Sequence, residues 1–377
     1  MTYNVMVKVL IVDDSQLIRN VLTEIVSSHP KMEVIGVAVD PYDAREKIKK
    51  LKPDVLTLDI EMPRMDGLTF LKNLMRLKPM PVVMISTLTL DGAEKTLDAL
   101  EIGAVDYVAK PRVSILKGFS EIEDVIRNKI YAAAHVKMNA LITDGTNLSV
   151  NKGNSFRGLD ESDNPCGNSE VMPAKNVLDG ISVSKKPCSV IAIGSSTGGT
   201  EALKKVLQSL SVNMPPIVVV QHMPSSFTDS FAKRLNKASK LTVVEFSENN
   251  MPLKKGYVYI ANGAEHFKLA LINKQLIGLR DDGEPVNLHK PAVDVLFDSV
   301  AEYVGSPAIG ILLTGMGSDG AKGLLRMKQG GALTIAQDKE SCVVWGMPRV
   351  AVEMDAVQYE LPLKEIGAFL EAVCLKI

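Results

Sequence analysis

The feature that most restricts the fold of this chain is a repeated alternation of short β-branched runs with segments of helical periodicity. Four such runs lie between residue 8 and about residue 129, at 9–12, 55–58, 82–85 and 105–108. The pattern returns from residue 188 onward, with runs at 190–193, 217–220 and 309–314. Strands that alternate with helices form parallel sheets, because a parallel pair needs a long crossover connection. The sequence therefore predicts an α/β fold for both blocks.

The two blocks are separated by a segment of different composition. Between about residues 138 and 186 the chain is rich in Asn, Gly, Ser, Asp and Lys, which is typical of a flexible linker. A length of 377 residues also exceeds one ordinary hydrophobic core. We expect a first domain at 1–130, a linker at 131–187 and a second domain at 188–377. In the second domain, 256–260, 266–272 and 275–279 are predicted to be short antiparallel strands beside the parallel ones.

Composition excludes several classes of protein. The 43 Lys and Arg residues nearly balance the 44 Asp and Glu residues, so no net field attracts nucleic acid or an anionic membrane. The cysteines, Cys166, Cys188, Cys342 and Cys374, are too far apart to suggest a zinc cluster or a disulfide framework. No segment resembles an export signal or a membrane span. We expect a cytoplasmic protein that neither binds nucleic acid nor inserts into a membrane.

Acidic residues follow two strands of the first block. Asp13 and Asp14 come directly after the run at 9–12, and Asp59 follows the run at 55–58. The carboxyl ends of parallel strands meet at one edge of a sheet, where three carboxylates would repel one another without a cation such as Mg²⁺. Ser86 and Lys110, also at strand ends, offer a hydroxyl and a cation for phosphoryl oxygens. Each residue alone is typical of a turn or cap, but together they predict a metal-dependent phosphate site.

These residues lie in longer motifs that resemble the response-regulator receiver domain over the first third of the chain. The motifs are Val-Asp-Asp-Ser at 12–15, Leu-Asp-Ile-Glu-Met-Pro-Arg-Met-Asp-Gly at 58–67 and Lys-Pro at 110–111. The resemblance implies a flavodoxin-like, doubly wound domain in which Asp59 accepts a phosphoryl group. It further implies that Mg²⁺ is held by Asp13, Asp14, Asp59 and the carbonyl of Glu61. Ser86 and Lys110 would be the switch residues.

A glycine-rich turn follows the first strand of the second block. The run at 190–193 leads into Gly-Ser-Ser-Thr-Gly-Gly at 194–199, and a helix-forming segment comes next. Such a turn gathers free backbone N–H groups that favour negative charge. It could cradle a phosphate, or it could be a nucleophile turn with oxyanion donors. The turn lacks the lysine of a P-loop and carries Ser196 at its tightest point, which favours the nucleophile.

A serine nucleophile needs a base and an orienting acid. His222 ends the buried run at 217–220, whereas His266 and His289 have no comparable strand-end position. Asp319 lies in the glycine-rich loop after the run at 309–314, although it could instead cap the helix that follows. The N–H of Met316 in the same loop could be a further oxyanion donor.

These segments resemble the chemotaxis methylesterase domain from about residue 188 to the end. The matching motifs include those at 193–202, 221–224, 289–297, 313–320 and 342–348. The resemblance implies Ser196 as nucleophile, His222 as general base and Asp319 as orienting acid, with Thr197, Gly198 and Met316 around the oxyanion. Ser195 departs from the alanine that such enzymes commonly carry.

The implied reaction is hydrolysis of γ-glutamyl methyl esters on the helices of methyl-accepting chemoreceptors, with deamidation of some glutamines. It needs no cofactor for ester hydrolysis, and it resets chemotaxis sensitivity. A chemotaxis histidine kinase would donate the phosphoryl group, and we expect the receiver to mask the active site until Asp59 is phosphorylated.

Two alternatives stay open. The spacing at 194–198 also fits the nucleophile elbow of α/β-hydrolases, in which Asp281 or Asp282 would act with His289 on another ester. Alternatively, the turn could grip an anionic ligand without any catalysis.

Overall fold

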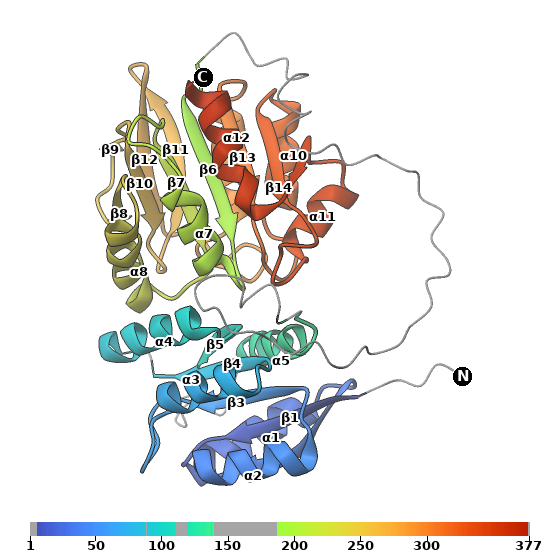
Figure 1. Cartoon of the computed structure of the whole chain (residues 1–377). Helices are drawn as coiled ribbons and strands as arrows, with labels where there is room; N and C mark the ends of the chain where they lie inside the picture. Colours follow the sequence, from blue (N-terminus) through green and yellow to red (C-terminus); the bar gives the residue numbers. More distant parts are fainter. Residues whose placement is uncertain (1–5, 88, 111–119, 137, 139–186, 376–377) are drawn as a thin grey trace.

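Two α/β units lie one above the other in the computed structural model, the first in blue and cyan and the second from green to red (Figure 1). The structure describes residues 6–87, 89–110, 120–136, 138 and 187–375. Most of the expected linker at 131–187 lies outside the described residues, as do Pro111 and Cys166. Within the described ranges, the longest apolar helices are still too short or too polar to cross a bilayer.

The first unit is a five-stranded parallel sheet in the order β2-β1-β3-β4-β5. Its strands are β1 (Val7–Val12), β2 (Met32–Ala38), β3 (Val55–Asp59), β4 (Val82–Ser86) and β5 (Asp106–Ala109). Its helices are α1 (Gln16–Ser27), α2 (Pro41–Leu51), α3 (Gly67–Leu77), α4 (Leu90–Ile102) and α5 (Ser120–Ala134). This strand order is the flavodoxin-like one, so the predicted fold of this unit is confirmed.

Polar residues at the ends of these strands begin the helices that follow. Ser15 and Asp40 accept hydrogen bonds from backbone N–H groups in the first turns of α1 and α2, and Asp66 and Thr89 do so for α3 and α4. These caps end each loop at a defined residue and hold the acidic side chains at the carboxyl edge of the sheet.

The second unit contains a seven-stranded sheet in the order β15-β14-β13-β6-β7-β10-β8, and every neighbouring pair in it is parallel. Its strands are β6 (Val190–Ser195), β7 (Ile217–Gln221), β8 (Thr242–Phe246), β10 (Tyr257–Ala261), β13 (Ala308–Leu312), β14 (Leu333–Gln337) and β15 (Tyr359–Leu361). Its helices are α7 (Gly199–Gln208), α8 (Ser225–Ala238), α9 (Val293–Tyr303), α10 (Ala321–Gln329), α11 (Met347–Glu353) and α12 (Leu363–Leu375).

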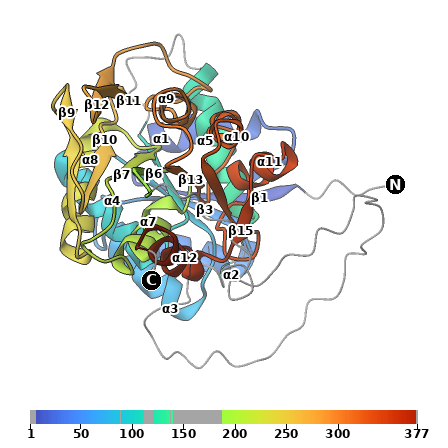
Figure 2. The same ribbon diagram turned by 90° about the horizontal axis from the view of Figure 1, so that it is seen from above.

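Helices cover both faces of this sheet. Seen from above, α9 and α10 lie on one side of the central strands, and α7 and α12 lie on the other (Figure 2). Ile191 and Ile193 of β6 belong to the hydrophobic core under α7 and α12, whereas Val190 and Ala192 belong to the core under α9 and α10. A strand buried on both faces has an almost continuous apolar sequence, which explains the unbroken run at 190–193.

A small antiparallel sheet, in the order β11-β12-β9, accompanies the large one. It consists of β9 (Met251–Pro252), β11 (His266–Ile272) and β12 (Gln275–Asp281). The hairpin expected at 266–279 is therefore confirmed. The antiparallel strand expected at 256–260 is wrong, because β10 lies parallel between β7 and β8. A short apolar run indicates a buried strand but does not indicate its direction.

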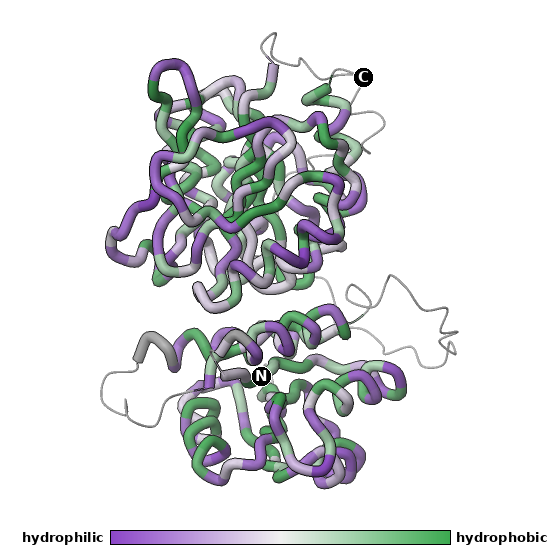
Figure 3. Tube along the Cα trace, turned by 90° about the vertical axis from the view of Figure 1, so that its left-hand side faces the viewer, coloured by the Kyte–Doolittle hydropathy of each residue, from purple (hydrophilic) through white to green (hydrophobic). Residues whose placement is uncertain are grey.

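The two units are packed against each other. Helix α4 and strand β5 of the first unit face α7 and α8 of the second (Figure 1), and one hydrophobic core cluster draws residues from both. Tyr107 stacks on Phe227 across this boundary, with ring centroids 4.8 Å apart. The hydropathy-coloured trace shows apolar segments inside each unit and a narrow zone where they meet (Figure 3).

Candidate active site

The glycine-rich turn is held between two neighbouring strand ends. Strand β6 pairs with β7 so that Ser195 lies opposite Gln221, and the next residues, Ser196 and His222, follow at the same edge. The Ser196 N–H donates to the carbonyl of Thr314 at 3.0 Å, and the Gln221 side-chain amide donates to the carbonyl of Ser196 at 3.0 Å. Both bonds fix the backbone of residue 196, so the position of its side chain is defined by β7 and by the loop after β13.

His222 and Asp319 form a buried pair beside this turn. The His222 Nε2 lies 2.8 Å from Asp319 Oδ2, and the two side chains are only 7% and 1% exposed. The other ring nitrogen, Nδ1, is buried without a hydrogen-bond partner. An ionised carboxylate accepts a hydrogen bond from Nε2–H, which leaves Nδ1 as the basic nitrogen. The Ser196 hydroxyl has no hydrogen bond to either residue within the described parts of the chain.

Asp319 receives several donors besides the imidazole. The backbone N–H groups of Val293 and Asp294, at 2.7 and 3.1 Å, and the Asn287 amide, at 2.8 Å, all donate to its carboxylate. Burial alone would raise the pKa of Asp319, but the hydrogen bond and charge of His222, together with these donors, bring that pKa down to about 2. Asp319 is therefore ionised at neutral pH.

Asp319 does not cap the helix that follows it, so that alternative is wrong. Gly320 is the N-cap residue of α10, which has no side-chain cap. Asp319 instead binds the N-terminus of α9, whose exposed N–H groups favour a negative charge. In return, Asp294 of α9 accepts a hydrogen bond from Gly323 in α10 at 2.6 Å. The two helices thus cap each other through Asp319 and Asp294.

The expected oxyanion residues surround Ser196. Gly198 is the N-cap residue of α7 and has a left-handed φ of +76°, and a Cβ there would lie 2.6 Å from Val343. Glycine is therefore required both by conformation and by space. Thr197 is buried, and Met316 is half-buried in the loop after β13. Among the described residues, no acceptor is found for the N–H groups of Thr197, Gly198 or Met316, which leaves them available to an oxyanion.

The two adjacent serines differ in their surroundings. Ser195 is completely buried, and its hydroxyl donates to Gln221 Oε1 at 2.7 Å. Ser196 is 8% exposed. Because a nucleophile must be reachable by a substrate, this difference favours Ser196 over Ser195.

The acid and base of the alternative hydrolase do not come together. Asp281 and Asp282 form ion pairs with Lys268 and Lys290, each at 2.5 Å, and not with His289. His289 instead stacks on His222, with ring centroids 3.7 Å apart and an angle of 11° between the rings. Burial, and then the proximity of His222, lowers the pKa of His289 to about 3. Sequence reasoning missed this stacking and the role of Asn287, because no local pattern signals either contact.

The acidic residues of the first unit also meet. Oxygens of Asp13, Asp14 and Asp59 lie within 4.8 Å of one another, and Lys110 Nζ is 2.7 Å from Asp59 Oδ2. Burial raises the pKa of Asp59 to about 6, although the bond to Lys110 opposes this change. The buried Asp13 Oδ2 has no hydrogen-bond partner, although Lys110 lies 3.5 Å away. A buried oxygen without a donor, among further carboxylates, fits a hard cation such as Mg²⁺.

The remaining receiver residues lie around this acidic cluster. Glu61 donates its N–H to Asp59 Oδ1 at 3.3 Å. The Ser86 hydroxyl receives a hydrogen bond from Thr96 Oγ1 at 2.6 Å and lies 3.2 Å from the carbonyl of Gly92. Ser86 is thus bonded to α4, the helix that contacts the second unit.

The first unit reaches directly into the serine site. The Thr197 hydroxyl donates to the carboxylate of Asp106, which begins β5 and is also bound by Lys129 at 2.9 Å. A receiver carboxylate therefore lies at the residue that follows Ser196. Sequence analysis predicted masking in general, but it did not identify Asp106.

Both halves of the chain match families of known proteins. The family model for CheB methylesterase matches residues 191–370, and that for the response regulator receiver domain matches 9–117. A protein-glutamate methylesterase/protein-glutamine glutaminase of Saccharophagus degradans is 50% identical over 98% of this chain and 99% of its own. A protein of the same description from Hydrogenovibrio crunogenus is 48% identical over 98% of this chain and 99% of its own. The solved CheB methylesterase catalytic domain of Thermotoga maritima is 43% identical, with a TM-score of 0.48, over 49% of this chain and 98% of that one. This chain, with its receiver domain followed by a methylesterase domain, belongs to the CheB methylesterase family.

Proposed function

We propose that this protein hydrolyses γ-glutamyl methyl esters of chemoreceptors, releasing methanol, and deamidates selected receptor glutamines, and that this resets chemotaxis sensitivity. The observation that carries the proposal is the buried His222–Asp319 pair, whose free Nδ1 lies at the same sheet edge as Ser196. The full-length relatives from Saccharophagus degradans and Hydrogenovibrio crunogenus are named for both activities. The lack of an ion pair between Asp281 or Asp282 and His289 argues against the alternative hydrolase.

In the proposed mechanism, Ser196 Oγ attacks the ester carbonyl while His222 Nδ1 accepts its proton. Asp319 keeps the proton of Nε2 in place and stabilises the imidazolium that forms. The N–H groups of Thr197, Gly198 and Met316 stabilise the negative oxygen. His222 then returns the proton to the departing methanol, and water hydrolyses the acyl-enzyme, which leaves a glutamate side chain in the receptor and restores the Ser196 hydroxyl. A glutamine side chain follows the same route with ammonia as the leaving group.

We further propose that the receiver controls this reaction, with a chemotaxis histidine kinase in the cytoplasm as phosphodonor. Asp13, Asp14, Asp59 and the carbonyl of Glu61 would hold Mg²⁺, which when bound offsets the charge of the phosphoryl oxygens. Lys110 and Ser86 would bind the phosphoryl group on Asp59. Because Ser86 is bonded to Thr96 of α4, its movement would disturb the helix that lies over the methylesterase unit. In this proposal the receiver domain comprises residues 1–130, the linker 131–187 and the methylesterase domain 188–377.

The nucleophile is tested by comparing Ser196→Ala with Ser195→Ala in the full-length protein. Methanol release from methylated receptor membranes should fall to background in the first variant and stay near wild type in the second, because the Ser195 hydroxyl is occupied by Gln221. A fluorophosphonate probe should label the wild type and Ser195→Ala only. Sustained methanol release by Ser196→Ala would refute the assignment, and an unlabelled wild type would favour an anion-binding module.

A further inference from the structure

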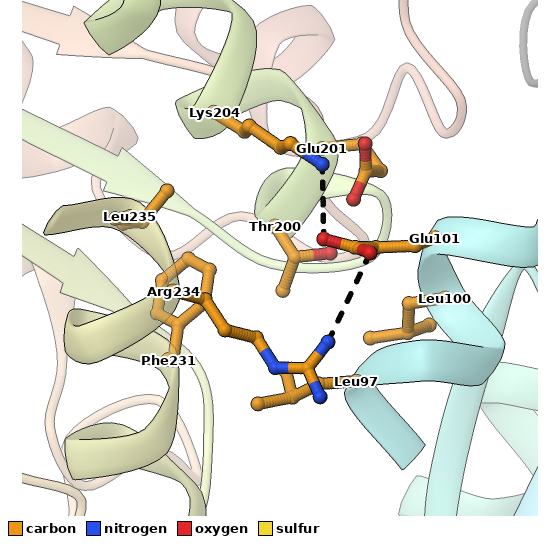
Figure 4. Close-up of a pocket in the computed structure, with 9 residues that line it drawn as sticks. All are labelled: Leu97, Leu100, Glu101, Thr200, Glu201, Lys204, Phe231, Arg234 and Leu235. Carbon is orange, nitrogen blue, oxygen red and sulfur yellow. Dashed lines mark hydrogen bonds and ion pairs between the residues drawn. The ribbon is translucent and has the colours of Figure 1, made fainter. Parts of the chain in front are cut away.

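The receiver helix α4 lies in a groove between two helices of the methylesterase unit. We call this the α7–α8 groove, defined by Thr200, Glu201, Lys204, Phe231, Arg234 and Leu235. Leu97, Leu100 and Glu101 of α4 face it, as the close-up shows (Figure 4). Leu97 and Leu100 are nearly fully buried. The contact therefore combines an apolar floor with charged edges.

The charges across this contact are complementary. Lys204 lies 2.9 Å from Glu101, and Arg234 lies 3.9 Å from the same carboxylate (Figure 4). Arg234 also lies 2.6 Å from Asp98. Arg234 also donates to the backbone carbonyl of Glu94 at 2.8 Å. In the part of the chain that the structure describes, every ion pair of Lys204 and Arg234 reaches to α4. These two cations lose their partners whenever the receiver moves away.

Both helices of the groove begin close to the active-site residues. Helix α7 begins at Gly199, three residues after Ser196, and α8 begins at Ser225, three residues after His222. A helical substrate that presents a side chain to Ser196 would therefore extend along the surface that both helices form. A helix rises about 1.5 Å per residue, so side chains seven residues apart lie on one face roughly 10 Å from each other.

From these contacts we propose that the α7–α8 groove is the docking surface for the glutamate-bearing helix of the substrate. In this proposal, α4 imitates that helix in the resting enzyme. The inference rests on the proposed function, because the methyl-accepting residues of the substrate are then glutamates, which are acidic whenever they are not esterified. Helix α4 has the same chemistry, with acidic Asp98 and Glu101 beside apolar Leu97 and Leu100. Asp106 adds a carboxylate at Thr197, where the product carboxylate of the reaction would form.

An exposed groove of this kind needs an occupant in the active state. When the receiver leaves, Phe231 and Leu235 lose the apolar side chains that cover them, and Lys204 and Arg234 lose their carboxylates. A contiguous apolar patch with charged edges is characteristic of a protein-binding surface. The acidic helix of the substrate restores both kinds of contact, whereas a neutral or basic helix restores only one.

The test uses the full-length protein with the double substitution Lys204→Glu and Arg234→Glu. Two substrates are compared, methylated receptor membranes and the small ester N-acetylglutamate γ-methyl ester, each with and without acetyl phosphate and Mg²⁺. With the phosphodonor, KM for the receptor should rise at least tenfold, while kcat/KM for the small ester should stay within twofold. Without the phosphodonor, small-ester hydrolysis should rise, because the same substitutions loosen α4.

Matched variants separate substrate docking from receiver docking. Lys233→Glu changes the same charge on α8, but Lys233 is exposed and pairs with Asp229 of its own helix, so neither substrate should be affected. Asp98→Asn with Glu101→Gln should raise basal small-ester activity and leave the receptor KM of the activated enzyme unchanged. If the charge reversal prevents folding, Lys204→Gln with Arg234→Gln takes its place.

Two results would overturn the proposal. An unchanged receptor KM in the activated groove variant would mean that the groove holds only the receiver. An equal loss on both substrates would mean that Lys204 and Arg234 act on the active site itself. Methanol release from receptor by the wild type is measured first, because its absence would refute the proposed function instead of the groove.

Discussion

At Asp319, a single carboxylate links the imidazole of His222 to the N-terminus of α9. The strand-end pattern of the sequence was enough to predict which histidine and which aspartate to pair. It could not predict that Nε2 faces the carboxylate and Nδ1 remains without a partner, because ring orientation depends on the whole packed site. The ring of His289 stacks on His222 and covers it. Burial and then the proximity of His222 lower the pKa of His289 to about 3, so this ring adds no charge at neutral pH.

Asp319→Asn should lower kcat by about 10⁴-fold, because an amide neither fixes the tautomer of His222 nor stabilises an imidazolium.

The same substitution should lower the free energy of unfolding. The carboxyl pKa is lowered to about 2, so its contribution to stability is present above the ordinary pKa and is lost as pH falls through about 2. The melting temperature of the variant should therefore lie below that of wild type at pH 7 and approach it near pH 2. Asp298→Asn, on the exposed part of α9, is the matched control. A variant with wild-type kcat would contradict the role of Asp319.

Helices α9 and α10 are joined at their N-termini by exchanged caps. Asp319 lies just before α10 and binds α9, while Asp294 of α9 binds α10 through Gly323. Asn287 donates to both carboxylates at 2.8 Å. A sequence indicates local caps well, but a cap provided by another helix requires the tertiary fold. For the same reason, the strand predicted at 256–260 exists as β10, but the antiparallel direction predicted for it is wrong.

Asp294→Ala should destabilise the second unit and disturb catalysis together. It leaves the N–H of Gly323 without its acceptor and removes one of the two acceptors of the Asn287 amide, which costs about 1–3 kcal/mol. Urea unfolding followed by circular dichroism should report this loss, and kcat for methanol release should fall because Asp319 is no longer held. Unchanged stability would show that the exchanged caps do not hold the helices together.

Over the whole molecule, the receiver contacts the methylesterase unit at the active site through an aromatic stack and a hydrogen bond. Tyr107 stacks on Phe227, and the carboxylate of Asp106 accepts a hydrogen bond from the Thr197 hydroxyl. The receiver motif and the methylesterase motif could each be recognised from sequence, because their residues follow strand ends at fixed spacing. The contact between them could not, because Asp106 and Thr197 are 91 residues apart and neither belongs to a pattern that names its partner.

Phosphorylation should activate the full-length enzyme through Asp59. Acetyl phosphate with Mg²⁺ should increase the rate of methanol release by wild type, while Asp59→Asn should stay at the basal rate with or without the phosphodonor. The physical reason is that Ser86 is tied to Thr96 of α4 and must leave it to bind a phosphoryl group. An equal rate of methanol release by wild type with and without phosphodonor would exclude control by the receiver.

The contact of α4 with the α7–α8 groove also affects the receiver itself. Docking of α4 and phosphorylation of Asp59 are coupled equilibria, and such coupling is reciprocal. If phosphorylation weakens the docking of α4 by some factor, docking disfavours phosphorylation by the same factor. The methylesterase unit is then more than an output that waits for a signal. Under the proposed control by phosphorylation, the ion pairs of Asp98 and Glu101 with Arg234 and Lys204 would set how much phosphodonor the receiver needs before it responds.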